Sequence, residues 1–140
     1  MIFDESHLEV VKNGVEMFNR DQFWECHEEF EHHWLENRGD PVRDVYWAII
    51  QVAAALFHFR EGNLTGAKGM LYKAVDKFER CEKAHIESEL LNKCLTWQEF
   101  KRVSRQINDL GEKATIEDFH RLYQFKFPDP SKWDELMGRQ

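Results

Sequence analysis

The chain has 140 residues, the length of one ordinary domain, and its 42% hydrophobic and 32% charged residues are typical of a globular protein. Its 19 basic and 26 acidic residues give a net charge of −7 with neutral histidines. This acidic balance argues against a nucleic-acid partner, which needs a basic face, and against an electrostatic membrane anchor. The longest apolar run, residues 47–56, is too short to cross a bilayer.

The three cysteines are Cys26, Cys81 and Cys94. Their odd number and wide spacing, with no signal peptide ahead of them, predict reduced thiols in a cytoplasmic protein. The sequence contains no Cys-x-x-Cys pair, which argues against a zinc ribbon or a thioredoxin-like site.

Apolar residues recur at helical spacing from the N-terminus and predict a first helix over residues 5–18. A polar break follows, in which either Asn19 or Asp21 can cap the next helix. That second helix covers residues 21–36, and Gly39 suits a left-handed terminus after it.

Asp40 and Pro41 supply a capping residue and a proline at the first helical position, so they begin a third helix, which runs over residues 42–60. This stretch is apolar on nearly all sides, which is typical of a buried central helix. Polar residues at every seventh position share one stripe along it. They are Asp44, Gln51 and His58.

A fourth helix, capped by Asn63 or Thr65, continues to about Glu82. Glycine is unfavourable inside a helix. Gly66 and Gly69 therefore predict that this helix packs closely against the alanines of the third. The short loops between these helices make neighbours antiparallel.

The last third of the chain carries weaker helical patterns. A fifth helix is expected around residues 86–94, a sixth between a capping box at residues 96–99 and Gly111, and a seventh after Thr115. Residues 133–137 are expected to dock as a short amphipathic tail. The sequence shows no strand pattern and no repeat, so it predicts an all-α fold, a compact helical bundle with short loops and about six or seven helices.

The second helix carries ionisable side chains on its apolar side. On a helical wheel, His27 lies within the apolar arc and Glu31 lies between two tryptophans, so both side chains are expected to point toward the core. A carboxylate is almost never fully buried unless it is paired or binds a metal. We therefore predict a polar cluster between the second and third helices. Its members are His27, Glu28, Glu31, Gln51 and His58.

Two interpretations of this cluster remain open. In the first, a divalent metal such as zinc, iron or manganese is bound by His27, Glu31 and His58. Gln51 then holds a water molecule, and Glu28 is a base or a further ligand. In the second, the same side chains form a buried hydrogen-bond network that fixes the helix register. Short motifs often match by chance, so the sequence favours the network.

Two ordered blocks of the sequence resemble a known family. The first block is Phe18-Asn19, Phe23-Trp24-Glu25, His27-Glu28, Phe30-Glu31 and Trp34. The second block is Ile49-Ile50-Gln51-Val52-Ala53-Ala54-Ala55, His58 and Gly62-Asn63-Leu64-Thr65-Gly66-Ala67. Both resemble the bacterial and archaeal family called domain of unknown function 309, over about residues 8–80. The chain departs from the family at Asp21, where glycine is common, and this costs little because aspartate also caps helices.

The resemblance implies a compact helical bundle without an established activity. It places motif residues of the family on the five positions of the predicted polar cluster. We expect one all-α domain over residues 1–140, with a family-like core over residues 8–80 and a C-terminal helical extension over residues 81–140.

The sequence favours an interaction or ligand-binding module that takes an unknown small molecule or protein partner. The alternative is a metal-dependent enzyme of the hydrolase type. A zinc protease is disfavoured because the pattern H-E-x-x-H requires histidine where Glu31 stands, four residues after His27. The sequence leaves open whether the chain is an enzyme and whether it forms a homo-oligomer.

Overall fold

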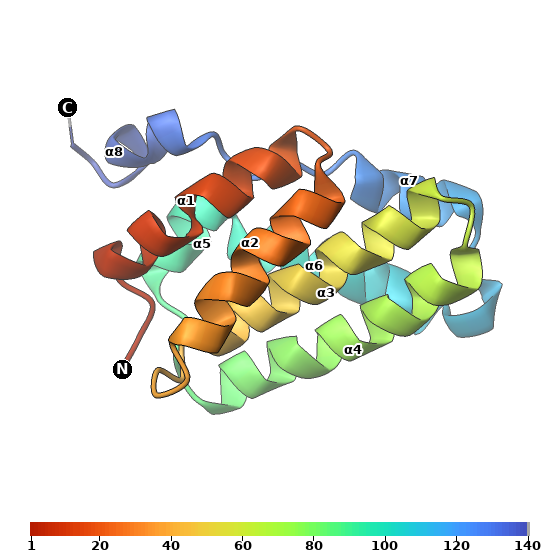
Figure 1. Cartoon of the computed structure of the whole chain (residues 1–140), viewed down its shortest axis with the longest axis horizontal. Coiled ribbons are helices and arrows are strands. Elements are labelled where there is room, and N and C mark those ends of the chain that lie inside the picture. Colours follow the sequence, from red (N-terminus) through yellow and green to blue (C-terminus); the bar gives the residue numbers. More distant parts are fainter. Residues whose placement is uncertain (140) are drawn as a thin grey trace.

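The computed structural model describes residues 1–139, which contain helices and turns but no strand, so the predicted all-α fold is confirmed. Eight α-helices lie in this range, one more than expected, because the docking tail forms a short helix of its own (Figure 1). They are α1 (Glu5–Asn19), α2 (Phe23–Glu36), α3 (Arg43–Arg60), α4 (Leu64–Lys83), α5 (Glu89–Leu95), α6 (Trp97–Asp109), α7 (Ile116–Tyr123) and α8 (Trp133–Leu136). Within residues 1–139, no helix is both long and apolar enough to cross a membrane.

Helix α3 lies at the centre of the bundle, with α2 and α4 packed along two of its sides (Figure 1). Val45, Ala48, Ile49 and Leu56 of this helix are fully buried. Burial of apolar surface is the main favourable term in folding, so a helix that is apolar all round is stable only when other elements surround it. The prediction that the third helix is central is confirmed.

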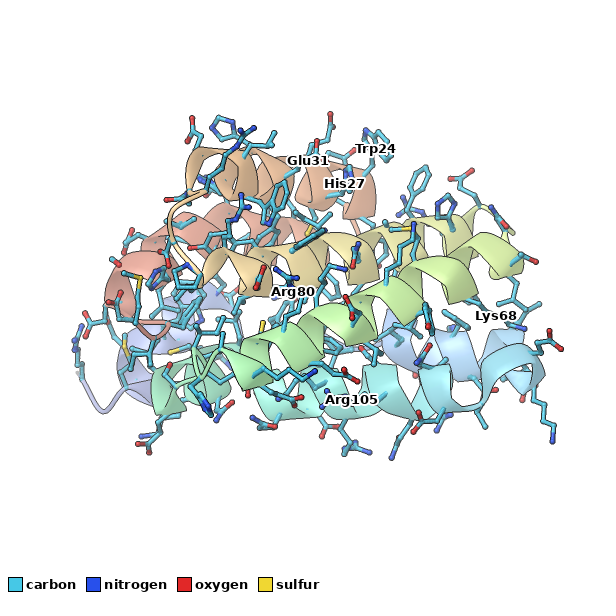
Figure 2. All side chains as sticks on the ribbon, turned by 90° about the horizontal axis from the view of Figure 1, so that it is seen from below. Trp24, His27, Glu31, Lys68, Arg80 and Arg105 are labelled. Carbon is cyan, nitrogen blue, oxygen red and sulfur yellow. The ribbon has the colours of Figure 1, made fainter. Side chains whose placement is uncertain are left out.

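The C-terminal helices cover the side of α4 that faces away from α2 (Figure 2). The ring of Phe100 in α6 lies 6.1 Å from that of Phe18 in α1 and 4.9 Å from that of Phe127, measured between ring centroids. The tail docks as expected, since Trp133 is buried and its Nε1 donates to the Cys94 carbonyl at 3.0 Å. Aromatic packing therefore joins the two ends of the chain.

Two residues expected to cap α2 have other roles. Helix α2 begins after Gln22, which makes no capping hydrogen bond through its side chain. Asn19 instead donates from Nδ2 to the Phe127 carbonyl at 3.0 Å and accepts the Phe127 N–H at Oδ1 at 2.9 Å. Asp21 has a φ of 61°. Glycine adopts this left-handed conformation at no steric cost, which explains why glycine is common at this position in the family that the sequence resembles.

We expect Asn19→Ala to lower the free energy of unfolding by about 1.5 kcal/mol, because it removes two hydrogen bonds and leaves backbone groups of a buried segment unpaired. Urea unfolding measures the loss, and hydrogen exchange at the Phe127 amide should become faster. Asn19→Asp keeps an acceptor but no donor, so its stability should lie between those of Asn19→Ala and the parent protein. Parent-like stability of Asn19→Ala would contradict a role for the two bonds.

Four further expectations about helix ends and glycines are wrong. Gly39 does not have a positive φ, so it is no left-handed terminus. Thr96 has a φ of 43° and makes no capping hydrogen bond through its side chain, so α6 lacks the predicted capping box. Helix α3 begins at Arg43 rather than beside Asp40, whose Oδ1 accepts the Val42 N–H in the preceding turn.

The fourth wrong expectation concerns the two glycines of α4, which do not pack against the alanines of α3. Asn63 caps α4 as predicted, with Oδ1 accepting the Gly66 N–H at 2.8 Å. A Cβ atom on Gly66 would lie 2.5 Å from Nδ2 of the same Asn63, so the capping side chain occupies this space. A Cβ atom on Gly69 would meet nothing within 4 Å. The packing of α4 on α3 therefore explains neither glycine.

Candidate functional site

The buried side of α2 is narrower than the helical wheel suggested. Phe23, Cys26 and Phe30 are its buried residues, whereas the side chain of Glu31 is 51% exposed. The prediction that Glu31 points into the core is therefore wrong. Glu31 lies about 80° from Phe23 around the helix, beyond the edge of the surface that α1 and α3 cover. His27, about 40° from Phe23, has a side chain that is 21% exposed and lies at that edge.

His27 and Glu31 are nevertheless neighbours on α2. Nε2 of His27 lies 3.6 Å from Oε2 of Glu31, one helical turn apart. The indole of Trp24 stacks on the His27 ring at 5.1 Å between centroids, and Figure 2 shows the three side chains along the same part of α2. Solvent screens such a pair, which contributes about 0–1 kcal/mol to stability. The arrangement is a surface cluster rather than a buried ion pair.

The polar stripe of α3 lies beside this cluster. Contacts between Trp24 and Phe57 and between Trp34 and Trp47 fix the antiparallel register of α2 and α3. In this register position 27 lies opposite position 54, which is about one turn from both Gln51 and His58. Gln51 is buried and His58 is half-buried. The register therefore places His27 at the same level along the bundle as Gln51 and His58.

Three polar atoms in this region are buried and have no hydrogen-bond partner in the protein. They are Nδ1 of His27, Nε1 of Trp34 and Oε1 of Gln51. A buried polar atom without a partner costs about 1–3 kcal/mol, and most native proteins contain few of them. The predicted polar network is therefore not closed within the protein.

The predicted metal ligands are not assembled as a set. Among residues 1–139, no three His, Cys, Asp or Glu side chains are grouped so that they can hold a metal ion. His27 and Glu31 form a pair, while His58 lies on α3 with its Nδ1 3.5 Å from Nδ2 of Asn63. Glu28 is exposed on α2.

Cations lie over the tryptophan rings where the C-terminal half of α2 packs against the N-terminal half of α3. These contacts were not predicted from the sequence. Cζ of Arg43 lies 4.2 Å from the centroid of the Trp34 ring. Nζ of Lys77 and Cζ of Arg80, both from α4, lie 4.3 Å and 5.3 Å from that of the Trp47 ring. Figure 2 shows Arg80 between α3 and α4. The available signal was the three-residue spacing of Lys77 and Arg80, which places them on one side of α4.

The outer side of α2 carries a regular pattern that the sequence analysis also overlooked. Trp24, Glu28, Glu31 and Leu35 are all exposed and recur at helical spacing, so they form one line along the helix. We call these four residues the α2 outer stripe. Trp24 is 47% exposed and Leu35 is 44% exposed. The stripe therefore has an apolar residue at each end and two carboxylates between them.

The cysteines do not contribute to a reactive site. Cys26, Cys81 and Cys94 are buried and form no disulfide, as the sequence predicted. Burial raises the pKa of the Cys26 thiol far above its usual range, and the nearby Glu29 and Glu25 raise this pKa further. A thiol with a raised pKa is a poor nucleophile near neutral pH.

Comparison with known proteins finds a family model that matches part of the first half of the chain. Residues 11–70 match the family model described as "Domain of unknown function (DUF309)". "Uncharacterized protein YpuF" of Bacillus subtilis (strain 168) is 39% identical over 64 residues, which cover 44% of this chain. The chain spans only about a third (35%) of the length of this relative. No solved structure matches the chain.

The matched segment includes the α2 outer stripe and all five residues of the predicted polar cluster. It also includes both sequence blocks whose resemblance was described above. Residues 11–70 of this chain therefore match the DUF309 family model, which their motifs had been found to resemble.

Proposed function

We propose that the chain is a protein-interaction module and that the α2 outer stripe binds an amphipathic helix of a partner protein. The observation that carries this proposal is the exposure of Trp24 and Leu35 on a helix with a buried apolar side elsewhere. Covering large exposed apolar side chains with a partner is favourable, because it removes apolar surface from water. Tryptophan is also among the residue types most enriched at binding hot spots.

The charge of α2 defines the chemistry of the partner. The helix contains no lysine or arginine, and its exposed Glu28 and Glu31 lie between the two apolar residues of the stripe. A complementary helix presents lysine or arginine at the two central positions and an apolar residue at each end. Complementary charge fixes register and speeds association, while apolar contacts supply most of the affinity.

Helix-in-groove recognition uses residues at such a spacing, which supports a helix as the bound element. The stripe spans 12 residues, and its two ends lie about 16 Å apart along α2 at a rise of 1.5 Å per residue. The N-terminal end of the stripe meets α3. Trp24 contacts Phe57 there, so the anchor of the stripe is held in place by the central helix.

The proposal is tested with a synthetic helical peptide that presents Leu, Lys, Lys and Leu at the spacing of the α2 outer stripe. Binding is measured by titration calorimetry and mapped by NMR. We expect Trp24→Ala to weaken the peptide at least tenfold, because the loss of one buried anchor costs about 2 kcal/mol. The double variant Glu28→Gln and Glu31→Gln should weaken it several-fold, and added salt should remove this difference.

The matched control is the double variant Glu9→Gln and Glu117→Gln, which removes two exposed carboxylates from α1 and α7. Its affinity for the peptide should equal that of the parent protein. A peptide with Glu in place of Lys should bind at least tenfold more weakly. Equal binding of both peptides, or equal effects of the two double variants, would show that the stripe does not select a basic helix. Sedimentation of the protein alone tests self-association, and a dimer abolished by Trp24→Ala would assign the stripe to a second copy instead.

A further inference from the structure

A separate cleft opens between α4, α6 and α7, away from the α2 outer stripe. Its cavity volume is about 440 Å³, within the range of about 300–1,000 Å³ that is usual for small-molecule sites. The residues that line it are Lys68, Gly69, Leu71, Tyr72, Ile107, Asn108, Gly111, Glu112 and Phe119. No residue of the predicted polar cluster belongs to this lining, so the cleft is independent of the proposed interaction site.

The deep part of the cleft is apolar. Leu71, Ile107 and Phe119 come from three different helices and are almost fully buried, so the fold holds their side chains rigidly. Tyr72 of α4 also lines the cleft and is 71% exposed. An apolar group that enters the cleft therefore rests on a preformed apolar floor and displaces water from the exposed side chain of Tyr72, which favours its binding.

Gly69 explains how the cleft stays open. A glycine inside a helix costs stability relative to alanine, and Gly69 lies in the second turn of α4. No packing requirement offsets this cost, since a Cβ atom on Gly69 would meet nothing within 4 Å. Gly69 lines the cleft, so any larger residue at this position places its side chain at or in the opening.

Lys68 supplies a positive charge to the same cleft. Its Nζ donates to the backbone carbonyl of Glu112 at 3.0 Å, and no carboxylate lies within 4.0 Å of it in the part of the chain that the structure describes. The ammonium therefore has two further donors for a ligand. Figure 2 shows Lys68 on α4 near the turn that follows α6.

We propose that this cleft binds an apolar monocarboxylate. The hydrocarbon part packs against Leu71, Ile107 and Phe119, and the carboxylate accepts hydrogen bonds from the Lys68 ammonium. The exposed carboxylate of Glu112 also belongs to the lining and favours a cation instead. Ligands that share one hydrocarbon chain and differ in their head group show whether the cleft prefers an anion or a cation.

The experiment measures binding of octanoate, octan-1-ol and octylamine by titration calorimetry at neutral pH and constant ionic strength. We expect octanoate to bind the parent protein about tenfold more tightly than octan-1-ol, and octylamine to bind more weakly than both. Lys68→Met should abolish the preference for octanoate over the alcohol. Gly69→Leu should weaken octanoate and octan-1-ol at least tenfold, while its melting temperature stays equal to or above that of the parent protein.

Lys73→Met is the matched control, because Lys73 is exposed on α4 and does not line this cleft. Its affinity for octanoate should equal that of the parent protein. The proposal is overturned if octylamine binds most tightly, if Lys68→Met retains the preference for octanoate, or if Gly69→Leu binds octanoate as the parent protein does. NMR shifts of residues in α4, α6 and α7 confirm that the ligand occupies this cleft and not the α2 outer stripe.

Discussion

Gly14→Ala is expected to destabilise the protein by about 2 kcal/mol, although alanine is the better helix former by about 1 kcal/mol. A Cβ atom on Gly14 would lie 2.3 Å from Cε2 of Phe30, far inside van der Waals contact. Phe30 is itself buried and lies against Tyr46 of α3, with ring centroids 6.2 Å apart. Its ring has little room to move, so the added methyl group must push α1 away from α2.

Gly69→Ala is the matched control for this prediction. It makes the same chemical change inside another helix, at a position where the added Cβ meets nothing within 4 Å. Gly69→Ala then changes only the helix propensity, and we expect its free energy of unfolding to rise by about 1 kcal/mol. Urea unfolding of both variants measures the two effects. The interpretation fails if the two substitutions change stability in the same direction.

A double variant separates the contact with Phe30 from other effects of Gly14→Ala. Phe30→Leu shortens the side chain that the new methyl group meets. Substitutions in direct contact are not additive, so the loss in the double variant should be smaller than the sum of the two single losses. Additive losses would show that the methyl group of Gly14→Ala clashes with something other than the Phe30 ring.

The sequence predicted the helices well because their apolar residues recur over many turns. Helix α3 was expected over residues 42–60 and covers Arg43–Arg60, while α4 was expected to reach Glu82 and ends at Lys83. A long apolar pattern averages over local exceptions, so the type and extent of such helices follow from it. The caps were less reliable. Asn19 and Thr96 suit a helix end, but Asn19 is hydrogen-bonded to the backbone of Phe127 and the Thr96 hydroxyl donates to the Leu95 carbonyl.

The candidate site shows a different limit of sequence reasoning. The helical wheel gave the correct order of burial along α2, from Phe23 through His27 to Glu31, but not the width of the covered surface. That width depends on how α1 and α3 pack against α2, which the sequence of α2 does not contain. A buried polar cluster was therefore expected where the structure has a solvent-exposed stripe with His27 at its edge.

Lys101→Met is expected to lower the free energy of unfolding at pH 7 by about 3 kcal/mol, because removing one partner of a buried ion pair leaves charges uncompensated. Lys101 is only 3% exposed. Its Nζ donates to Oε2 of Glu82 at 2.8 Å and to Oε2 of Glu87 at 2.6 Å. Oε2 of Glu87 also accepts the Nε1–H of Trp97, at 2.5 Å, so this ammonium holds together side chains from α4, α6 and the segment before α5.

The effect of Lys101→Met should depend on pH. Hydrogen bonds from Arg105, opposed in part by desolvation and reinforced by Lys101, lower the pKa of Glu82 from 4.5 to about 2. A carboxylate whose pKa is lower in the folded protein contributes stability that is present above its unfolded pKa and is lost as pH falls through its folded pKa. The parent protein should therefore lose stability as pH falls from about 5 to about 2, because over this range the unfolded chain binds a proton at Glu82 that the folded protein does not. The difference between Lys101→Met and the parent protein should shrink over the same range.

Lys93→Met is the control for Lys101→Met. Lys93 also pairs with a glutamate, Glu89 at 3.1 Å, but here both members of the pair are exposed. Its loss should be below about 1 kcal/mol, as is usual for a surface ion pair. Urea unfolding at pH 7, 5 and 3 measures both variants. Since Arg105 still binds Glu82 through two hydrogen bonds of 2.7 Å, Lys101→Met should remain folded and its unfolding measurable. Equal losses for Lys93→Met and Lys101→Met, or a Lys101→Met loss that does not change with pH, would show that the ammonium contributes only packing.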